Sequence, residues 1–406
     1  MAPTNDSIGG GDMRLRQKVR IALCVGTLLG AGAVSALAEV PVQILYLRHE
    51  VDRPPVLSNL DPVPDDLGLA GAEVALRDVQ TTGAFLGHAY ALEAVSIAPE
   101  ADFAAEAAAA LTRARLVLVG GAADDLLAVA DLPAAQGALL FNVASGDGAL
   151  RSGSCRANLL HMLPEDAARA DALMQFFVRR QWVRLVMITG PSPEDRDWAE
   201  TLRRAAQKFG LSFLAEKEWT FDTDLRESTM DEVPRFTQDF PDHDALIVAD
   251  ARDDFGRYVE HNAWLPRPVA GSDGLMPLAW SPMIEAWGAV QLHNRFKDHA
   301  GRAMRSQDYA AWAAVRAIGE AVTRTGSADP TALRTFMLGP DFLLDGFKGR
   351  GLSFRPWNGQ LRQPIALANA RALVTLAPIE GFLHHRHELD SLGLDEPESQ
   401  CQAFKE

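Results

Sequence analysis

Apolar and polar positions follow two patterns along the chain, and together these patterns predict its secondary structure. Short runs such as Val40–Leu47 and Leu116–Gly120 are almost continuously apolar, which is typical of buried strands in a parallel sheet. Between such runs lie segments such as Leu69–Val79, where apolar residues recur at helical spacing. This alternation of strand and helix predicts βαβ units, and therefore parallel sheets with helices on both faces.

The pattern begins again after residue 164, so we expect two such units. In the first, the remaining strands are expected at His88–Ile97 and Ala138–Val143, and the helices at Glu100–Arg113 and Asp124–Asp131. In the second, we expect strands at Val183–Thr189, Leu211–Trp219, Ala245–Ala249 and Pro268–Gly271, and helices at Glu165–Gln181, Pro193–Phe209, Asp231–Phe240 and Asp253–His261.

The last third of the chain differs. Gln307–Gly326 predicts a long amphipathic helix and Pro330–Leu338 a shorter one, and three antiparallel strands are expected at Phe347–Arg355, Gln363–Ala370 and Leu373–Ala377. We therefore predict an α/β protein with two doubly wound parallel-sheet lobes joined by crossover hinges. The first lobe is assigned residues 39–163 and 286–339, and the second residues 164–285 and 340–406. Ligands of such sheets bind at the carboxyl ends of the strands, here facing an interlobe cleft.

The N-terminal segment has the layout of an export signal. Basic residues between Arg14 and Arg20 precede the uncharged stretch Ile21–Ala38, which ends in the small-x-small sequence Ala36-Leu37-Ala38. This order of basic, apolar and cleavable regions predicts a signal peptide over residues 1–38, cleaved after Ala38. The alternative is an uncleaved membrane anchor, which the short, Gly- and Ala-rich stretch disfavours. We expect a periplasmic protein.

Composition narrows the function classes. With 48% hydrophobic and 23% charged residues, the 406-residue chain is neither disordered nor a multi-span membrane protein. Its formal net charge of -15 argues against binding nucleic acid.

The three cysteines of the sequence are too few for a four-cysteine zinc site. Export removes Cys24, and in an oxidising compartment the remaining Cys155 and Cys401 favour a disulfide, with two free thiols as the alternative.

Common catalytic motifs are missing from the sequence. It contains no phosphate-binding P-loop, no Gly-rich dinucleotide motif after the first strand, no G-x-S-x-G elbow and no H-E-x-x-H. The richest metal-like stretch is His384–Glu388, but adjacent residues of an extended chain point to opposite sides. Missing motifs do not exclude an enzyme, but no catalytic constellation is visible, so we expect neither catalytic nor metal-binding residues. We interpret His384–Glu388 as a polar segment.

Four stretches carry a family resemblance. They are the helix opening Gly68-x-x-Gly71, the segment Asn158–Pro164, the helical stretch Asp308–Ala314, and Asp345–Gly349 followed by Leu352–Phe354. In their order and spacing the chain resembles type I periplasmic substrate-binding proteins of ABC transporters, in the branched-chain amino acid group. The resemblance implies a hinged clamshell that captures a small molecule and delivers it to a permease in the inner membrane.

The C-terminal region carries a narrower resemblance. His384–Gly393 and Asp395–Ser399 resemble the subgroup associated with alcohol dehydrogenase systems that depend on pyrroloquinoline quinone (PQQ). This implies periplasmic alcohol oxidation as the context, PQQ as the bound ligand rather than a catalytic cofactor, and a quinoprotein dehydrogenase as a candidate partner. Two alternatives stay open, namely an amino acid, amide or small carboxylate as the ligand, and a non-transporting accessory or sensor role.

Candidate ligand-binding residues follow the predicted strands. Amino acid binders of the group usually use hydroxyls in two first-lobe loops, where this chain has Gly121 and Ser145. PQQ is flat and carries three carboxylates, so its site requires arginines for paired hydrogen bonds and an aromatic wall. Besides Gly121 and Ser145, the predicted site comprises Arg48, His49, Arg53, Arg196, Trp198, Asp250, Arg252 and Trp280. The alternative for each arginine is a solvated surface charge.

Overall fold

The computed structural model describes residues 39–52, 62–220 and 225–405. The chain divides into residues 1–38 and a unit of residues 39–406, and only the latter is described below. The predicted signal peptide and Arg53 lie outside the described residues.

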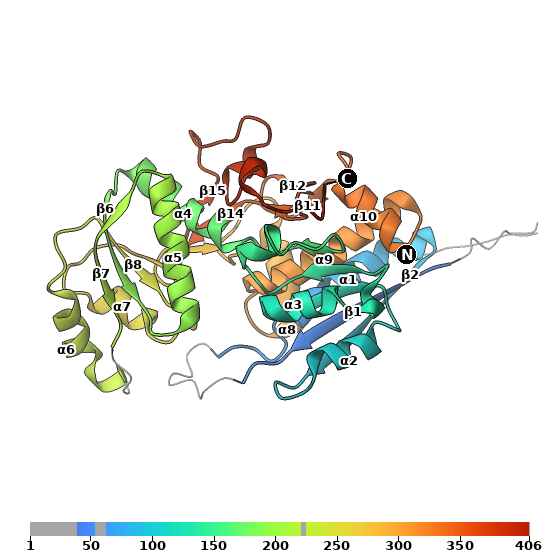
Figure 1. Cartoon of the computed structure of the whole chain (residues 1–406), viewed down its shortest axis with the longest axis horizontal. Coiled ribbons are helices and arrows are strands. Elements are labelled where there is room, and N and C mark those ends of the chain that lie inside the picture. Colours follow the sequence, from blue (N-terminus) through green and yellow to red (C-terminus); the bar gives the residue numbers. More distant parts are fainter. Residues whose placement is uncertain (1–38, 53–61, 221–224, 406) are drawn as a thin grey trace, which may run out of the picture. The chain divides into compact units, whose positions relative to one another are not determined.

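The first lobe, which carries the labels β1, β2 and α1 in Figure 1, is built on a five-stranded parallel sheet. The strand order is β2-β1-β3-β4-β5. Its strands are β1 (Val40–His49), β2 (His88–Ile97), β3 (Leu116–Gly120), β4 (Leu139–Asn142) and β5 (Leu159–His161). Successive side chains of a strand point to opposite faces. Ile44 and Tyr46 therefore pack in one core with α1 (Leu69–Leu86) and α9 (Ser306–Thr325). Leu45 and Leu47 pack in another with α2 (Phe103–Ala110) and α3 (Ala123–Ala130), so both faces of the sheet are covered.

The second lobe repeats this plan with a four-stranded parallel sheet in the order β7-β6-β8-β9. The strands are β6 (Arg184–Thr189), β7 (Ser212–Glu218), β8 (Ala245–Ala249) and β9 (Val269–Gly271). One face packs on α4 (Asp166–Arg180) and α5 (Pro193–Lys208). The other packs on α6 (Leu225–Thr237) and α7 (Gly256–Asn262). The predicted α/β fold with two doubly wound lobes is confirmed.

The last third of the chain contributes to both cores. Helices α8 (Ala289–Ala300), α9 and α10 (Pro330–Leu338) pack in the first core. A small antiparallel sheet of β10 (Met276–Leu278), β14 (Ile365–Ala368) and β15 (Leu373–Ala377) contributes Ile365, Leu367 and Ala377 to the second core. The remaining sheet comprises β11 (Leu344–Asp345), β12 (Gly351–Phe354) and β13 (Leu361–Arg362).

The β11-β12-β13 sheet packs away from the second core. Leu344, Leu352 and Leu361 are buried in the first core. The closing strands are thus divided between two separate sheets. The residue bounds assigned to the two lobes, including residues 340–406 for the second, stay a prediction. In the described part of the chain, no helix combines the length and hydrophobicity that a membrane span requires.

A disulfide joins Cys155, just before the last strand of the first-lobe sheet, to Cys401, at a sequence separation of 246. Both cysteines are buried in the first core. This is the pair that the cysteine count of the exported chain favours.

Helices α1 and α9 approach each other closely at Gly71. A Cβ atom on Gly71 would lie 1.9 Å from the backbone oxygen of Asp308, so only glycine fits at this position. The Asp308 carboxylate in turn accepts a hydrogen bond of 2.7 Å from the backbone N–H of Gly68, just before α1 begins. The Gly68-x-x-Gly71 motif therefore allows the long helix α9 to pack directly on α1.

Replacing Gly71 by alanine should lower the free energy of unfolding by about 1–3 kcal/mol, because the new methyl group must displace backbone rather than a side chain. Urea unfolding followed by circular dichroism would measure the change. Gly148→Ala is the matched control, because a Cβ there meets nothing within 4 Å. Equal stability of the two variants would contradict the close packing of α1 and α9.

Candidate ligand-binding cleft

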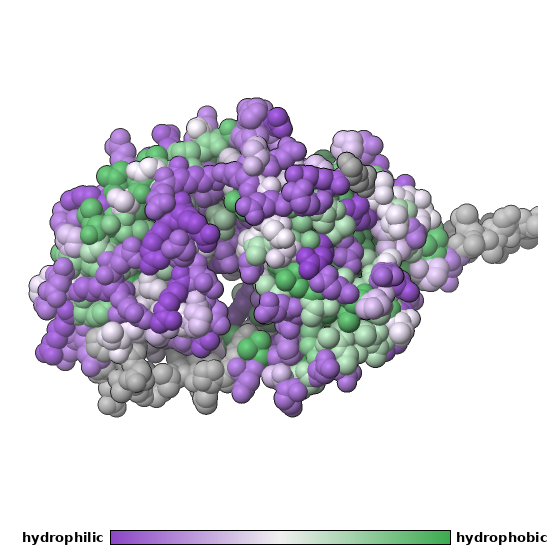
Figure 2. Space-filling model, viewed as in Figure 1, coloured by the Kyte–Doolittle hydropathy of each residue, from purple (hydrophilic) through white to green (hydrophobic). Residues whose placement is uncertain are grey.

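A cavity of about 2000 Å³ lies at the carboxyl ends of the parallel strands, and residues of both lobes line it. On the first-lobe side it is lined by Arg48 at the end of β1, by Gly121 after β3 and by Ser145 after β4. On the second-lobe side it is lined by Trp198 on α5 and by Asp250 after β8. Figure 2 shows a hollow bordered largely by hydrophilic residues. This is where parallel α/β sheets bind ligands.

The first-lobe wall is held in place by two side chains. Asp125 lies in the first turn of α3. Its Oδ2 accepts a hydrogen bond of 2.9 Å from the Ala122 backbone N–H, and its Oδ1 lies 2.9 Å from Nδ1 of His49. A Cβ on Gly121 would lie 2.8 Å from an Asp125 oxygen, so glycine allows the loop to pass this carboxylate. His49 also stacks on Phe103, with ring centroids 4.6 Å apart.

The second loop of this wall depends on Asn142 at the end of β4. Its Oδ1 accepts a hydrogen bond of 2.9 Å from the Ser145 backbone N–H, and its Nδ2 donates one of 2.8 Å to the Ser145 carbonyl. Asn142 is fully buried, so these bonds form without competition from water. They fix the backbone of the loop and place Ser145 at the edge of the cavity.

The second-lobe wall contains an arginine stacked on a tryptophan. The Arg169 guanidinium carbon lies 4.9 Å from the ring centroid of Trp198, and the indole is almost fully buried. Arg169 also donates a 3.1 Å hydrogen bond to the Pro277 carbonyl and pairs with Asp166 at 2.7 Å. The planar guanidinium is therefore held in one orientation at the edge of the cavity, which it lines.

Arg169 was missed by the sequence analysis, which searched the loops after strands. A signal was available in the sequence. Asp166 and Arg169 are three residues apart at the start of the helix that follows the crossover, so they share one helix face next to the hinge.

Six of the predicted site residues line the cavity: Arg48, His49, Gly121, Ser145, Trp198 and Asp250. Arg48 donates a hydrogen bond to the Asp65 carbonyl. The structure places three others elsewhere. Arg196 and Arg252 are exposed and pair with Glu218 and Glu194, both at about 3 Å. Trp280 is buried in the first core, stacked on Tyr309.

Asp250 stabilises the structure of the second lobe as well as lining the cavity. Its buried carboxylate accepts three backbone hydrogen bonds of 2.8–2.9 Å, from Asp254, Phe255 and Gly256 at the start of α7. Burial raises the pKa of Asp250, while these three hydrogen bonds act against the rise. A carboxylate at a strand end can thus serve the following helix rather than a ligand.

The charge of the lining is strongly acidic. Eleven carboxylate side chains line the cavity, against four lysine or arginine side chains. Some carboxylates are paired, as Asp166 is with Arg169 and Asp171 with Lys208 at 2.8 Å. Carboxylates still outnumber lysine and arginine side chains when these two pairs are left out of the comparison. The cavity as a whole therefore disfavours a ligand with several negative charges.

The described residues hold no group of three or more His, Cys, Asp or Glu side chains placed to bind a metal ion. In the segment His384–Glu388, the His384 and His385 rings are in contact and His384 lies 3.3 Å from Asp395. Arg386 pairs with Glu396 at 3.2 Å. The segment is thus held by hydrogen bonds and ion pairs to neighbouring residues.

Comparisons with known proteins agree with this geometry. Residues 66–230, less than half of the chain, match the family described as periplasmic binding protein. No curated protein matches the sequence.

Three solved structures illustrate the structural similarity. An ABC transporter substrate-binding protein from Sphaerobacter thermophilus has a TM-score of 0.67 and 16% identity, over 87% of this chain and 100% of its own. A branched-chain amino acid ABC transporter periplasmic ligand-binding protein from Burkholderia xenovorans LB400 has a TM-score of 0.66 and 14% identity, over 90% and 100%. A solute-binding protein of an R. palustris ABC transporter, in complex with benzoate, has a TM-score of 0.62 and 11% identity, over 89% and 99%. The chain has the type I periplasmic binding protein fold.

Asp171 should make the stability of the protein depend on pH. Burial raises its pKa to about 6, and the neighbouring Lys208 acts against the rise. Because the folded state binds this proton more tightly than the unfolded chain, the group contributes stability below pH 4 that is lost as the pH rises through 6. The loss is on the order of 1.4 kcal/mol per unit of pKa shift.

Urea unfolding of the parent and of Asp171→Asn between pH 4 and pH 7 would test this. The variant should lack this part of the pH dependence, whereas Asp197→Asn, at an exposed position of the same cavity, should keep it. Identical pH slopes for the parent and Asp171→Asn would contradict the raised pKa.

Proposed function

We propose that this protein captures a small organic solute between its lobes and delivers it to an ABC-type permease in the inner membrane. The observation that carries the proposal is the cavity at the carboxyl ends of the strands of both sheets, with walls from both lobes. Binding between two lobes couples ligand capture to their closure, since a ligand that contacts both favours the closed form. We further propose that the chain is exported to the periplasm, as the basic and apolar segments before Glu39 indicate.

The size of the cavity supports a mechanism that includes closure. Pockets that enclose small ligands typically measure about 300–1,000 Å³, whereas this cavity measures about 2000 Å³. A small solute would therefore contact one wall first and be enclosed only when the lobes approach. Closure would exclude water and so strengthen each charged contact with the ligand.

Arg169 is the residue best placed to recognise a carboxylate. It is fixed by Trp198, Asp166 and the Pro277 carbonyl, so little side-chain entropy remains to be lost on binding. A guanidinium can donate two parallel hydrogen bonds to a carboxylate, and the neighbouring Asp166 can accept one from an amine. This pairing favours a ligand with one carboxylate, with or without a cationic group.

The relatives are consistent with this ligand class. The R. palustris protein was solved in complex with benzoate, which carries a single carboxylate. The protein from Burkholderia xenovorans is described as a branched-chain amino acid transporter component. An amino acid or a small carboxylate is therefore our first candidate.

PQQ is the second candidate. The C-terminal resemblance suggests it, and the observation in its favour is the stack of Arg169 on Trp198, since a flat ligand with carboxylates requires both an arginine and an aromatic wall. The eleven carboxylates of the lining weigh against a ligand with three negative charges. A quinoprotein dehydrogenase as a partner, and an accessory or sensor role without transport, stay proposals from the resemblance alone.

Isothermal titration calorimetry with leucine, glutamate, benzoate and PQQ, each under the same conditions, would test the proposal. We expect saturable binding of at least one monocarboxylate or zwitterion, and weaker or no binding of PQQ. Arg169→Gln should weaken that binding by roughly 10- to 100-fold, the effect of losing a hydrogen bond to a charged group. Arg196→Gln is the matched control, because Arg196 is exposed and pairs with Glu218.

Two results would contradict the assignment of a monocarboxylate or zwitterion held by Arg169, and no binding of any of the four compounds would count against all the candidates named here. Tighter binding of PQQ than of any monocarboxylate would make PQQ the ligand. Equal effects of Arg169→Gln and Arg196→Gln would show that the ligand does not contact Arg169.

A further inference from the structure

The C-terminal segment 389–404, which we call the strap, is buried in the cores of both lobes. Leu392 packs in the second core with α4 and α5. Cys401 and Phe404 pack in the first core. The strap thus connects the lobes in addition to the crossings of the chain itself.

The strap is anchored to the second lobe at Gly393. The Gly393 backbone N–H donates a 2.8 Å hydrogen bond to Asp171 on α4, and its carbonyl accepts one of 2.9 Å from Lys208 on α5. Next to it, the Leu394 N–H donates to the buried Glu165 at 2.6 Å. Gly393 has a φ of +78°, and a Cβ there would lie 1.7 Å from a Glu165 oxygen, so this anchor requires glycine.

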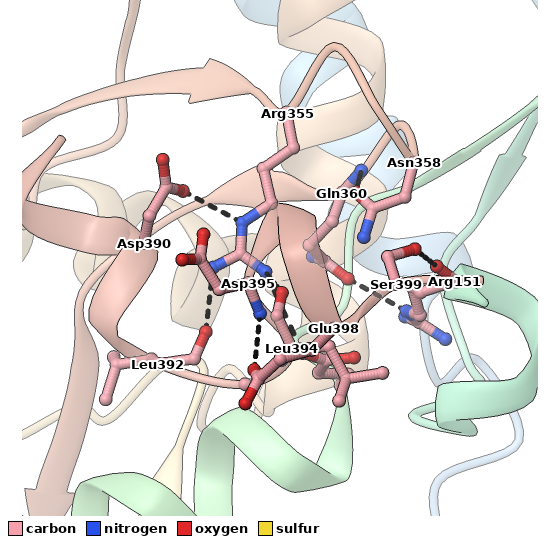
Figure 3. Close-up of polar contacts among 12 residues, drawn as sticks. Arg151, Arg355, Asn358, Gln360, Asp390, Leu392, Leu394, Asp395, Glu398 and Ser399 are labelled. Atoms are coloured by element: carbon pink, nitrogen blue, oxygen red, sulfur yellow. Dashed lines mark hydrogen bonds and ion pairs between the residues drawn. The ribbon is translucent and has the colours of Figure 1, made fainter. Parts of the chain in front are cut away.

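Arg355 holds the middle of the strap. Its buried guanidinium donates to the carbonyls of Leu392 and Leu394 at 2.7 and 3.0 Å and pairs with Asp390 at 2.9 Å (Figure 3). Arg362 pairs with the same Asp390 at 2.8 Å. The two arginines follow β12 and end β13, so the strap is tied to the sheet that packs in the first core.

The anchor in the first lobe is partly covalent. The Ser399 hydroxyl donates a 3.0 Å hydrogen bond to the Arg151 carbonyl, and the Gln400 N–H donates one of 3.0 Å to Ser152. The disulfide from Cys401 to Cys155 follows directly. Thermal motion can break the hydrogen bonds, but the first-lobe end of the strap cannot leave while the disulfide is intact.

Little chain remains between the two anchors. Leu394 and Ser399 are five residues apart, and Glu396–Glu398 form a short 3₁₀ helix between them. Five residues span at most about 17 Å when fully extended, and a 3₁₀ turn rises only about 2 Å per residue. Gly393, Leu394, Glu398 and Gln400 also line the cavity, so the strap forms part of its wall.

We propose that the strap, tied by the disulfide, limits how far the cleft can open. A rotation that widens the cleft along this wall moves the second-lobe anchor away from the first. The chain between the anchors then has to unwind its 3₁₀ helix or release Gly393. The proposal concerns the motion of the two lobes in the ligand-free protein. It rests on the proposed function in one respect, namely that the cleft is taken as the binding site.

The test compares the ligand-free protein with its Cys155→Ser/Cys401→Ser variant. We expect a larger radius of gyration in small-angle X-ray scattering for the variant. Hydrogen exchange at the backbone amides of Gly393 and Leu394 should be faster by about tenfold or more. Reduction of the parent protein with dithiothreitol should reproduce both changes.

A second variant keeps the test decisive if the double serine variant does not fold. Gly393→Ala removes the second-lobe anchor and leaves the disulfide intact, so it should also increase the radius of gyration. Leu126→Ala is the control. It removes buried side-chain volume from the core between the first sheet and α2 and α3, where it lowers stability without touching the strap.

An unchanged radius of gyration in Gly393→Ala and in the reduced parent would overturn the proposal. So would an equal increase in Leu126→Ala, because the expansion would then follow from lost stability alone. No ligand is used, so failure here is distinct from failure of the titrations that test the proposed function.

Discussion

Two buried guanidinium groups hold together segments that are far apart in the sequence. Arg151 is fully buried, which lowers its pKa to about 10, and it donates hydrogen bonds to the carbonyls of Asp147 and Leu163 and to Gln360. Arg355 is nearly as buried and is paired with Asp390. An unpaired buried charge would cost several kcal/mol, so these partners have to stay in place. The crossover between the lobes, the β12-β13 turn and the C-terminal segment are consequently joined at one place next to the cleft.

The two parallel sheets could be predicted from the sequence because their strands are buried on both faces and therefore almost continuously apolar. Leu116–Gly120 and Ala245–Ala249 were predicted with the bounds that the structure has. Helix α8 was missed, because only Ala289, Leu292 and Phe296 of its twelve residues are buried. The three-residue strands β5 and β10 were not predicted, whereas the equally short β9 was, because it continues the alternation of strands and helices in the second lobe. The place of β5 and β10 depends on pairing with residues far away in the sequence, which local patterns do not report.

The position of the cavity could be predicted from the sequence, but the side chains that line it could be predicted only in part. The rule that ligands bind at strand ends led to Arg48 and Ser145, which line the cavity, as does Trp198 near the start of α5; that these residues bind a ligand stays a prediction. The same rule could not show that the Asp250 carboxylate accepts hydrogen bonds from the start of α7 instead of being free for a ligand. Nor could it find Arg169, which reaches the cavity from a helix. The roles of Asp250 and Arg169 depend on the direction of their side chains, and packing between helices and strands sets that direction. The same packing determines the charge of the cleft, where an acidic lining surrounds a few cations, among them the oriented Arg169.

The cysteine inventory has a consequence for how the protein matures. Cys155 is synthesised 246 residues before its partner Cys401, so this disulfide cannot form until almost all of the polypeptide has been made. The sequence has one other cysteine, Cys24, within the segment proposed to be cleaved on export. Once that segment is gone, no competing thiol remains in the chain. Maturation would then require an oxidant but no isomerase, and a wrongly paired cysteine could arise only between two molecules.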